Sequence, residues 1–412
     1  MKPIGVKWVF KTKLNESGEV NKYKARLVAK GYAQQYRVNY TKVFAAVARL
    51  DTIRLILALA AQNNWDIFQL DVKSAFLHGE LSEEIFVQQP LGYEKKGEED
   101  KVYKLRKALH GLKQAPRAWY SKIEAYFVQA GFERCLCEHT LFTKWKEGGK
   151  ILIVSLNVDD LIYTGNDKSM CDDFKNSMML EFDMSDLEKM RYFLRVEVIQ
   201  NSNGIFVYQR KYVREILARF GMDRSNSVQN PIVPSTKLTK DEAGTRVDET
   251  LFKQVVGSLM YLTATRLDLM YGVSPISRFM SYPIESHWLA AKKLLRYVKG
   301  IIELGILYKK GDYTDLIAYT YSDFAGDLDD RKSTSGFVFL LSSGAISWSS
   351  KKQPVVTLST TEVEYIAATY CACQCIWLRR VLKQLCHKEE KSTLIQCDNS
   401  STIKLSKNPV FH

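Results

Sequence analysis

Two apolar runs flank a pair of adjacent aspartates in residues 151–165 (ILIVSLNVDDLIYTG), and this pattern restricts the fold more than any other in the chain. Each run is short and rich in Ile, Leu and Val, which is typical of a buried strand. The stretch therefore predicts a β-hairpin with the carboxylates of Asp159 and Asp160 at its tip. Asp is also a common turn residue, so the pair taken alone is better explained by turn chemistry.

A third aspartate changes that balance. Asp71 lies in an earlier strand pattern, residues 68–72, in a similar apolar setting. Three carboxylates on neighbouring strand ends can hold two divalent cations, and cations about 3.5–4 Å apart are a standard means of catalysing in-line phosphoryl transfer. Asp71, Asp159 and Asp160 are thus candidate metal ligands and catalytic residues.

The charge of the chain points to a polyanionic partner. The 412 residues are enough for two or three domains, and they carry a formal net charge of +13. Residues 1–50 alone hold 11 Lys/Arg against 2 Glu. Within them, residues 22–32 alternate cations with aromatics, which can neutralise phosphates and stack on bases. The alternative is a solvated basic strand with ordinary packing aromatics.

Other functional classes find little support in the sequence. No apolar segment reaches the roughly 18 residues of a membrane span, and residues 1–8 lack the apolar core of a signal peptide. The 8 cysteines in so long a chain favour a reducing compartment over a disulfide scaffold. Cys371, Cys373 and Cys375 lie in a helical pattern without partners at zinc-finger spacing, so we expect buried helix cysteines there.

The remaining patterns predict a mixed architecture. A turn-rich connection at 15–19 joins the first two strands, 229–250 is typical of a linker, and a further region opens near Tyr313 with strand and helix patterns of an α/β layer fold. The other strands are expected at 7–14, 23–30, 192–198, 204–208, 316–321, 336–341, 345–349 and 394–397, and the helices at 51–64, 116–131, 167–182, 211–220, 250–300 and 361–385. The helix at 51–64 is expected to be capped by Asp51 or Thr52.

Two further features could contact a nucleotide. Phe76 follows Asp71 by five residues, where an aromatic ring in a nucleotidyl transferase can collide with a ribose 2′-hydroxyl; alternatively it packs in the core. Residues 109–120 form a loop entering a helix, whose N-terminus and Lys113 could face nucleotide or template. The alternative there is a surface loop punctuated by Gly and Pro.

These features occur in the order of reverse transcriptase motifs. Their amino-acid sequences closely resemble the polymerase region of copia-type retrotransposon Pol polyproteins. The resemblance extends over essentially the whole chain. It is carried by KWVFK at 7–11, KARLVAKG at 24–31, QLDV at 69–72, AFLHG at 75–79, GLKQAPR at 111–117, YFL at 192–194, GSLMYL at 257–262, LLRY at 294–297, RKSTSG at 331–336, WSSKKQ at 348–353 and NPVFH at 408–412.

The resemblance implies an α+β fold, with a right-hand polymerase (fingers, palm and thumb) followed by an incomplete ribonuclease H-like α/β domain. Fingers and palm would occupy 1–228, a linker and helical thumb or connection region 229–312, and the ribonuclease H-like domain 313–412. The implied activity is RNA-directed DNA polymerisation with Mg²⁺ or Mn²⁺. The implied partners are an RNA template, a DNA primer, RNA/DNA hybrid and dNTPs, and also a second copy of the chain or other Pol products. The implied location is a cytoplasmic virus-like particle or the nucleus, and no membrane is implied.

The resemblance also implies roles for individual residues. Asp71, Asp159 and Asp160 would bind metal, Phe76 would exclude ribonucleotides, and the cations of the second strand would contact nucleotide phosphates or template. Those cations are Lys24, Arg26 and Lys30. In the last domain the pattern points to Asp323, Glu364 and Asp398. Each of the three also has an alternative explanation without catalysis. Asp323 could be a turn residue, Glu364 a favourable Glu at a helix N-terminus, and Asp398 the cap of the next helix.

The chain departs from the family at several positions. Asn157 stands where the family usually has a tyrosine beside the primer end, and Glu188 and Arg195 stand where it has glycines, which matters if the backbone there needs positive φ. The family is two residues longer around Asp323 and continues beyond the position of His412 into a fourth metal-binding carboxylate. Further departures are Ala45, Ala46, His110 and Leu267.

Two functions follow. The first is a polymerase with impaired ribonuclease H activity. The second is a decayed relic that only binds nucleic acid. A third, binding to membrane surfaces, would need an amphipathic cationic helix, and the sequence offers no convincing one.

Overall fold

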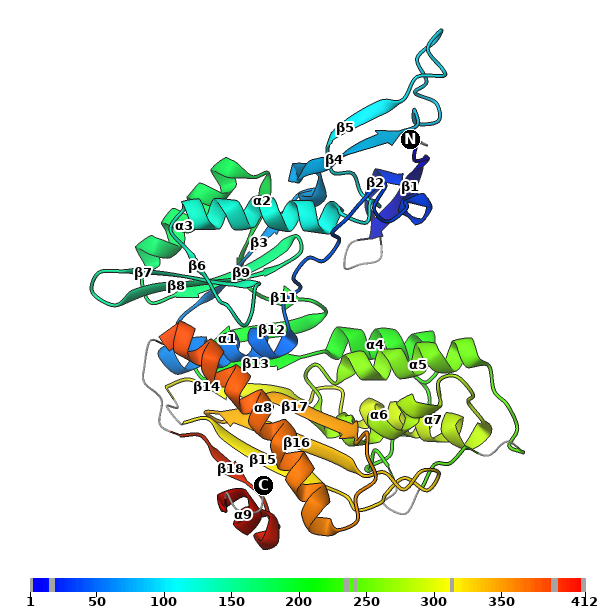
Figure 1. Ribbon diagram of the computed structural model, residues 1–412, viewed down its shortest axis with the longest axis vertical. Coiled ribbons are helices and arrows are strands. Elements are labelled where there is room, and N and C mark those ends of the chain that lie inside the picture. Colours follow the sequence, from blue (N-terminus) through cyan, green and yellow to red (C-terminus); the bar gives the residue numbers. More distant parts are fainter. Residues whose placement is uncertain are drawn as a thin grey trace. The chain divides into compact units, whose positions relative to one another are not determined.

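The computed structural model describes residues 3–14, 19–232, 237–240, 243–311, 315–386 and 392–408 (Figure 1). The chain divides into two units: unit 1 is residues 1–48 and 68–188, and unit 2 is residues 49–67 and 189–412. Four parts of the sequence-based expectations lie outside the described residues. They are most of the turn at 15–19, the Pro234–Thr236 part of the linker, Tyr313 and residues 409–412 of the last motif. The units are described separately below.

Unit 1 is built on a six-stranded sheet in the order β10-β3-β9-β8-β7-β6. The side chains of α2 and α3 pack on strands β3, β8 and β9 in one apolar core, which includes Trp119, Phe127, Phe174 and Tyr163. Strand β8 is buried along nearly its whole length, as the apolar run at 151–154 predicts. The elements are β3 (Ile67–Val72), α2 (Ala115–Gln129), β6 (Glu133–Arg134), β7 (Leu141–Lys146), β8 (Lys150–Asn157), β9 (Asp160–Gly165), α3 (Lys168–Glu181) and β10 (Met184–Lys189).

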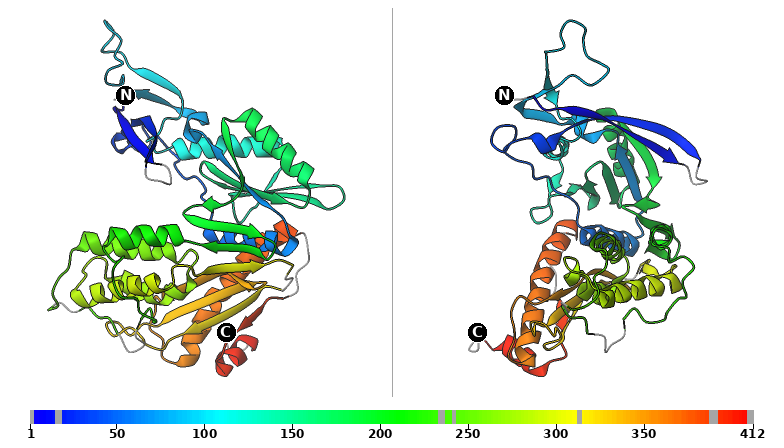
Figure 2. Two further views of the ribbon diagram at one scale, coloured as in Figure 1. Left: turned by 180° about the vertical axis from the view of Figure 1, so that it is seen from behind. Right: turned by 90° about the vertical axis from the view of Figure 1, so that its right-hand side faces the viewer.

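The basic N-terminal segment of unit 1 forms a long antiparallel ribbon of β1 (Val6–Leu14) and β2 (Val20–Ala29), seen in Figure 2. A small second core, containing Ile4, Ala29 and Leu112, lies at its base. The backbone N–H of Ala29 donates to the carbonyl of His110 at 2.7 Å, which fixes the end of β2 to the loop before α2. The remaining elements are η1 (Gly31–Ala33), η2 (Ala75–His78), β4 (Glu80–Val87) and β5 (Tyr103–Lys107).

Unit 2 contains two four-stranded sheets and a helical segment. One sheet has the order β11-β12-β13-β14 and the other β17-β16-β15-β18, in which only β15 and β18 are parallel. Helix α8 packs on β15 and β16, and the helices between β13 and β14 share their own apolar core. The strands are β11 (Tyr192–Phe193), β12 (Val196–Asn201), β13 (Gly204–Tyr208), β14 (Gly305–Lys309), β15 (Ile317–Ser322), β16 (Thr334–Leu341), β17 (Gly344–Lys352) and β18 (Leu394–Gln396).

The helices of unit 2 match the periodic stretches of the sequence. Helix α1 is held by Arg54, which donates to the carbonyls of Ile346 and Ala264 at 2.7 and 2.8 Å. In the described residues every helix is too short or too polar to cross a lipid bilayer. The helices are α1 (Leu50–Asn63), α4 (Arg210–Arg219), α5 (Glu249–Leu262), η3 (Leu267–Leu269), α6 (Met270–Ile276), η4 (Ser277–Phe279), α7 (Glu285–Gly300), α8 (Thr360–Cys386) and α9 (Ser400–Lys407).

Some local expectations were wrong. The strand predicted at 192–198 is broken by Leu194 and Arg195, whose φ angles of 48° and 59° turn the chain between β11 and β12. Helix α1 begins at Leu50, and its N-cap Arg49 makes no side-chain cap, so Asp51 lies in the first turn instead. The chain passes from one unit to the other at 48/49, 67/68 and 188/189, whereas the sequence-based boundaries at 228/229 and 312/313 stay a prediction.

Candidate active site

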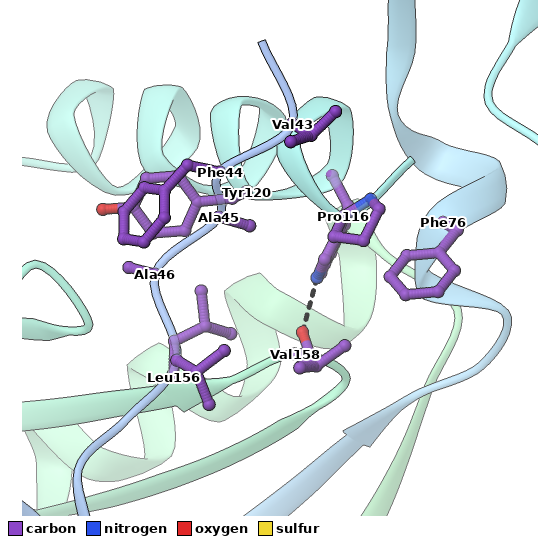
Figure 3. Close-up of a pocket in the computed structure, with 11 residues that line it drawn as sticks. Val43, Phe44, Ala45, Ala46, Phe76, Pro116, Tyr120, Leu156 and Val158 are labelled. Atoms are coloured by element: carbon purple, nitrogen blue, oxygen red, sulfur yellow. Dashed lines mark hydrogen bonds between the residues drawn. The ribbon is translucent and has the colours of Figure 1, made fainter. Parts of the chain in front are cut away.

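The predicted hairpin is formed by β8 and β9, with Asn157 opposite Asp160 and Val158-Asp159 as its two-residue loop. Val158 has a φ of 60°, which is rare for a β-branched residue and costs about 1–3 kcal/mol. Its carbonyl accepts a 2.5 Å hydrogen bond from Nε1 of Trp119 on α2 (Figure 3). This bond and the short loop hold the tip in one conformation.

Asp71 lies beside this tip. The backbone N–H of Val72 donates to the carbonyl of Asp159 at 2.8 Å, which joins β3 to the hairpin loop. Gln69 and Asp71 share one side of β3, because side chains alternate along a strand. Nε2 of Gln69 donates to Oδ1 of Asp160 at 3.2 Å, so Asp160 lies on that same side. The three predicted carboxylates therefore gather at one edge of the unit 1 sheet.

The carboxylates repel one another. Burial is the largest cause that raises the pKa of Asp160 to about 6, and the charges of Asp159 and Asp71 raise it further, against the hydrogen bond from Gln69. Burial and the two neighbouring charges thus make the ionised form of Asp160 unfavourable without a further partner. Oxygen donors with surplus negative charge suit a hard divalent cation such as Mg²⁺. The donor set of this edge therefore fits the cations that the sequence predicts.

Phe76 lies in η2, close to the hairpin. Its ring centroid is 5.4 Å from that of His110, and the side chain is partly buried against both apolar cores of unit 1. It also lines a cavity of about 360 Å³, whose other walls include Pro116 and Val158 (Figure 3). The ring therefore serves as core packing and as the wall of an open space beside the carboxylate hairpin.

The cations of β2 approach the same region. The pKa of His110 is lowered by burial first, and then by the charges of Arg26 and Lys24, while Asp159 opposes the shift. Lys24 and Arg26 are two residues apart and so share one side of the strand. Lys24, Arg26 and Asp159 all shift the pKa of His110. The basic ribbon and the carboxylate hairpin are therefore both close to this imidazole.

Lys30 and Lys113 each make a contact within the protein, through the backbone of Lys30 and the side chain of Lys113. The backbone N–H of Lys30 donates to the carbonyl of Gly5 at 2.8 Å, at the end of β2. The Lys113 ammonium lies 3.2 Å from the hydroxyl of Tyr40 and 4.8 Å from the centre of that ring. Roles for these two lysines toward nucleotide or template remain predictions.

Gly111 explains how the loop before α2 comes so close to β2. Its φ is 91°, and a Cβ atom there would lie 2.2 Å from the carbonyl oxygen of Ala29. Only glycine combines this backbone conformation with such an approach. The loop thereby brings His110 beside the cations of β2.

A second carboxylate cluster lies in unit 2. Oε1 of Glu364, on the first turns of α8, accepts from the backbone N–H of Ser322 at 2.7 Å. Ligand atoms of Glu364, Cys397 and Asp398 all lie within 4.8 Å of one another. In the described parts of the chain no other three such atoms come as close, so Asp71, Asp159 and Asp160 are more widely spaced.

Asp323 is not a member of this second cluster. Its Oδ1 accepts from the backbone N–H of Thr334 at 2.7 Å, and its carboxylate lies against Gly326, where a Cβ atom would be 2.4 Å from Oδ2. The structure therefore brings together Glu364 and Asp398 and turns Asp323 into its own loop. Asn399 caps α9, accepting from Thr402 N–H at 2.9 Å, so the capping alternative for Asp398 was wrong.

The structure also locates three departures from the family pattern. Asn157 is buried, and its Oδ1 has no hydrogen-bond partner. Glu188 and Arg195 have φ angles of 58° and 59°, in the region that favours glycine. The expected cost of losing glycine at these two positions is therefore supported by the backbone.

Comparison with known proteins agrees with the resemblance seen in the sequence motifs. A family described as reverse transcriptase (RNA-dependent DNA polymerase) matches residues 1–234. The retrovirus-related Pol polyprotein from transposon RE1 of Arabidopsis thaliana is 40% identical over 99% of this chain, and that from transposon TNT 1-94 of Nicotiana tabacum is 39% identical over 100%. The chain spans 28% and 32% of the length of these relatives.

Proposed function

Since the chain belongs to the reverse transcriptase family, we propose that it extends a DNA primer on an RNA or DNA template as the polymerase part of a copia-type retrotransposon Pol polyprotein. The observation that carries this proposal is the gathering of Asp71, Asp159 and Asp160 at one sheet edge. Burial first, and then the charges of Asp159 and Asp71, raise the pKa of Asp160, which supports a site that is completed by cations.

The residues around this edge have separable roles in the proposal. Asp71, Asp159 and Asp160 would hold Mg²⁺ or Mn²⁺, which when bound stabilises the charge that develops during nucleotidyl transfer. Trp119 keeps the hairpin tip in place through its bond to Val158. Lys24 and Arg26 would neutralise phosphates of the nucleotide or template, because they lie on the same side of β2 near the site.

The proposal extends to the domains. The six-stranded sheet of unit 1 would be the palm, the ribbon of β1 and β2 would belong to the fingers, and helices α4 to α7 would form the thumb. The sheet of β15 to β18 with α8 would be the ribonuclease H-like domain. We propose that its cleavage of RNA/DNA hybrid is impaired, because the carboxylate of Asp323 is hydrogen-bonded inside its own loop instead of joining Glu364 and Asp398.

Primer extension on an RNA template tests the polymerase proposal. Asp159→Asn keeps the size of the side chain but removes a metal-binding charge, so extension should fall about 100-fold or more. Asp172→Asn, on the exposed side of α3, is the matched control and should extend normally. Equal extension by the native chain and Asp159→Asn would overturn the proposal.

Phe76 gives a prediction about sugar selection. Phe76→Ala should raise the use of ribonucleotides relative to deoxyribonucleotides by about 10-fold or more, because the ring no longer blocks the 2′-hydroxyl. Phe76→Tyr keeps the ring and should keep the selection. The ratio of kcat/KM for the two sugars is the measurement, and a ratio unchanged in Phe76→Ala would rule out the gate.

Asn157 motivates a second candidate function, a protein that binds primer–template without extending it. If Asn157 places the primer end poorly, Asn157→Tyr should restore extension by about 10–100-fold, since a 1 Å misplacement can cost that much. Salt-sensitive binding without extension in both proteins would favour the second candidate.

A further inference from the structure

Two cysteines lie against one another in the loop between β6 and β7 of unit 1. The sulfurs of Cys135 and Cys137 are 3.4 Å apart, and both residues are reduced in the structure. In an extended chain, residues two positions apart are separated by up to about 7 Å, which is near the upper limit for a disulfide. The bend of the chain at Leu136 and Cys137 shortens this span and lets the two thiols touch.

The segment that carries the pair is held at both ends. The backbone N–H of Cys135 donates to the carbonyl of Leu141 at 2.9 Å, and the N–H of Leu141 donates to the carbonyl of Glu138 at 3.0 Å. Arg134, immediately before the pair, forms an ion pair with Glu124 on α2. The fold therefore keeps the thiols in contact, which gives each a high effective concentration toward the other.

The pair combines a protected thiol with a reachable one. Cys135 is 1% exposed, whereas Cys137 is partly exposed beside Leu136, which lies on the outside of the loop. An oxidant in solution therefore reacts first at Cys137, and Cys135 is the nearest thiol to the product. Burial first, and then the hydrogen bond and charge of Cys135, raise the pKa of Cys137 to about 12, so oxidation should be slow at neutral pH and faster in alkali.

We propose that Cys135 and Cys137 form a reversible disulfide that loosens the support of the carboxylate hairpin. With oxidised glutathione as oxidant, the thiolate of Cys137 attacks one glutathione sulfur and releases the other glutathione as a thiolate. The thiolate of Cys135 then attacks the Cys137 sulfur and releases the second glutathione. Overall, the two cysteines lose two protons and two electrons, and one glutathione disulfide becomes two glutathione thiols.

The short spacing of the cysteines makes this bond easy to reverse. A ring closed over a single intervening residue departs from relaxed disulfide geometry, so reductants should open it readily. In the reducing compartment that the cysteine content predicts, the dithiol is therefore the resting form. The disulfide would form when the oxidised fraction of the glutathione pool rises.

The loop is bonded to two residues beside the hairpin. The carbonyl of Thr140 accepts from the N–H of Leu156 on β8 at 2.9 Å, and the carbonyl of His139 accepts from the hydroxyl of Tyr120 on α2 at 2.7 Å. Tyr120 and Leu156 line the same cavity as Phe76 (Figure 3). Bonded sulfurs lie about 2 Å apart, so closing the pair shifts the loop by about 1 Å and should weaken the bond from Leu156.

Mass spectrometry of one tryptic peptide tests the disulfide. Trypsin releases residues 135–144, which contain these two cysteines and no other. The native chain is incubated with oxidised glutathione at about pH 8.5, where more of the thiol is ionised, and the remaining thiols are alkylated before digestion. The peptide should then lack two hydrogens and carry no alkyl group, and dithiothreitol treatment before alkylation should reverse both changes.

Two serine variants make this test specific. Cys137→Ser should not lose the two hydrogens, and its Tm shows whether it is folded. Cys373→Ser, at an exposed cysteine of α8, should oxidise like the native chain. A native peptide that stays fully alkylated, or that keeps a glutathione adduct, would overturn the proposal.

Hydrogen exchange tests the link to the hairpin. In the oxidised native chain the Leu156 amide should exchange about 10-fold or more faster than in the reduced chain, because its acceptor on Thr140 has moved. In Cys137→Ser, oxidised glutathione should leave this exchange unchanged. Equal exchange in the two forms of the native chain would refute the loosening.

Primer extension gives a third readout, which rests on the proposed function. Oxidation should slow extension by the native chain about 10-fold or more, and dithiothreitol should restore it. Equal extension by the oxidised and reduced chains would refute control of the site by the disulfide. A chain that extends in neither form would contradict the proposed polymerase, whereas the peptide and hydrogen-exchange results would still decide the disulfide and the loosening.

Discussion

Asp160 makes the stability of the metal-free protein depend on pH. Its pKa rises from 3.8 to about 6 in the folded chain. The favourable contribution of this raised pKa is complete below pH 3.8 and is lost as the pH rises through 6. Asp160→Asn removes the titration, so at pH 7.5 it should be more stable than the native chain by about 1–2 kcal/mol, allowing for solvent screening of this part-exposed group.

Urea unfolding at pH 4 and pH 7.5 without divalent cations measures this effect. The advantage of Asp160→Asn should be small at pH 4 and should shrink at pH 7.5 when Mg²⁺ is added, because the native carboxylate then has a partner. Asp172→Asn should show neither dependence. An advantage for Asp160→Asn that does not change between the two pH values would contradict the raised pKa of Asp160.

Arg195 shows a backbone conflict at a single residue. Its φ of 59° favours glycine, but its side chain has contacts: a 3.1 Å ion pair with Glu215 and a cation–π contact with Tyr212 at 5.1 Å. Comparing Arg195→Gly with Arg195→Ala separates the two effects, since both lose the contacts and only glycine relieves the backbone. Arg195→Gly should be the more stable by about 1 kcal/mol in urea unfolding. Equal stability would show that the backbone there is not strained.

At the level of elements, α1 depends on one buried arginine. Arg54 is 7% exposed, donates to two carbonyls and to Asp51, and lies 3.8 Å from the ring centre of Trp348. Arg54→Met should lower the free energy of unfolding by about 3 kcal/mol or more, because the carbonyls of Ile346 and Ala264 lose their donor.

Two further variants test whether the guanidinium geometry is responsible. Arg54→Lys keeps the charge but has no planar fork to reach all three acceptors, so it should recover only part of the loss. Asp51→Asn should cost less than about 1 kcal/mol, since only the partly exposed contact changes. A loss below 1 kcal/mol in Arg54→Met would refute the role of Arg54.

The long periodic helices and apolar strands were predictable from the sequence, including β8, β9 and α8. Several short strands were not, among them β5 and β10, whose residues are mostly polar and exposed or half-buried. Their strand conformation depends on hydrogen bonds to partners distant in sequence, which periodicity does not reveal. The same holds for the site: the three aspartates were predicted from their setting, but Gln69 and Trp119 contribute through contacts that only the fold creates.

For the whole molecule, the net charge of +13 predicts salt-dependent binding of primer–template. Each phosphate contact contributes about 0.9 to the slope of log affinity against log salt. The double variant Lys24→Ala/Arg26→Ala should therefore lower that slope by nearly 2 in fluorescence anisotropy over a series of KCl concentrations. The double variant Arg224→Ala/Lys310→Ala changes the net charge equally at exposed positions of unit 2 and serves as the control. Equal changes in both would indicate a general charge effect.

The pairing of β13 with β14 has a consequence for how this chain can vary. Tyr208, the last residue of β13, lies opposite Gly305, the first residue of β14. The whole helical segment from α4 to α7 thus leaves and returns at a single rung of an antiparallel ladder. In topological terms it is the loop of a hairpin. Helices could be lengthened, lost or exchanged there without altering the order of the strands, so this rung is a natural point of insertion within unit 2.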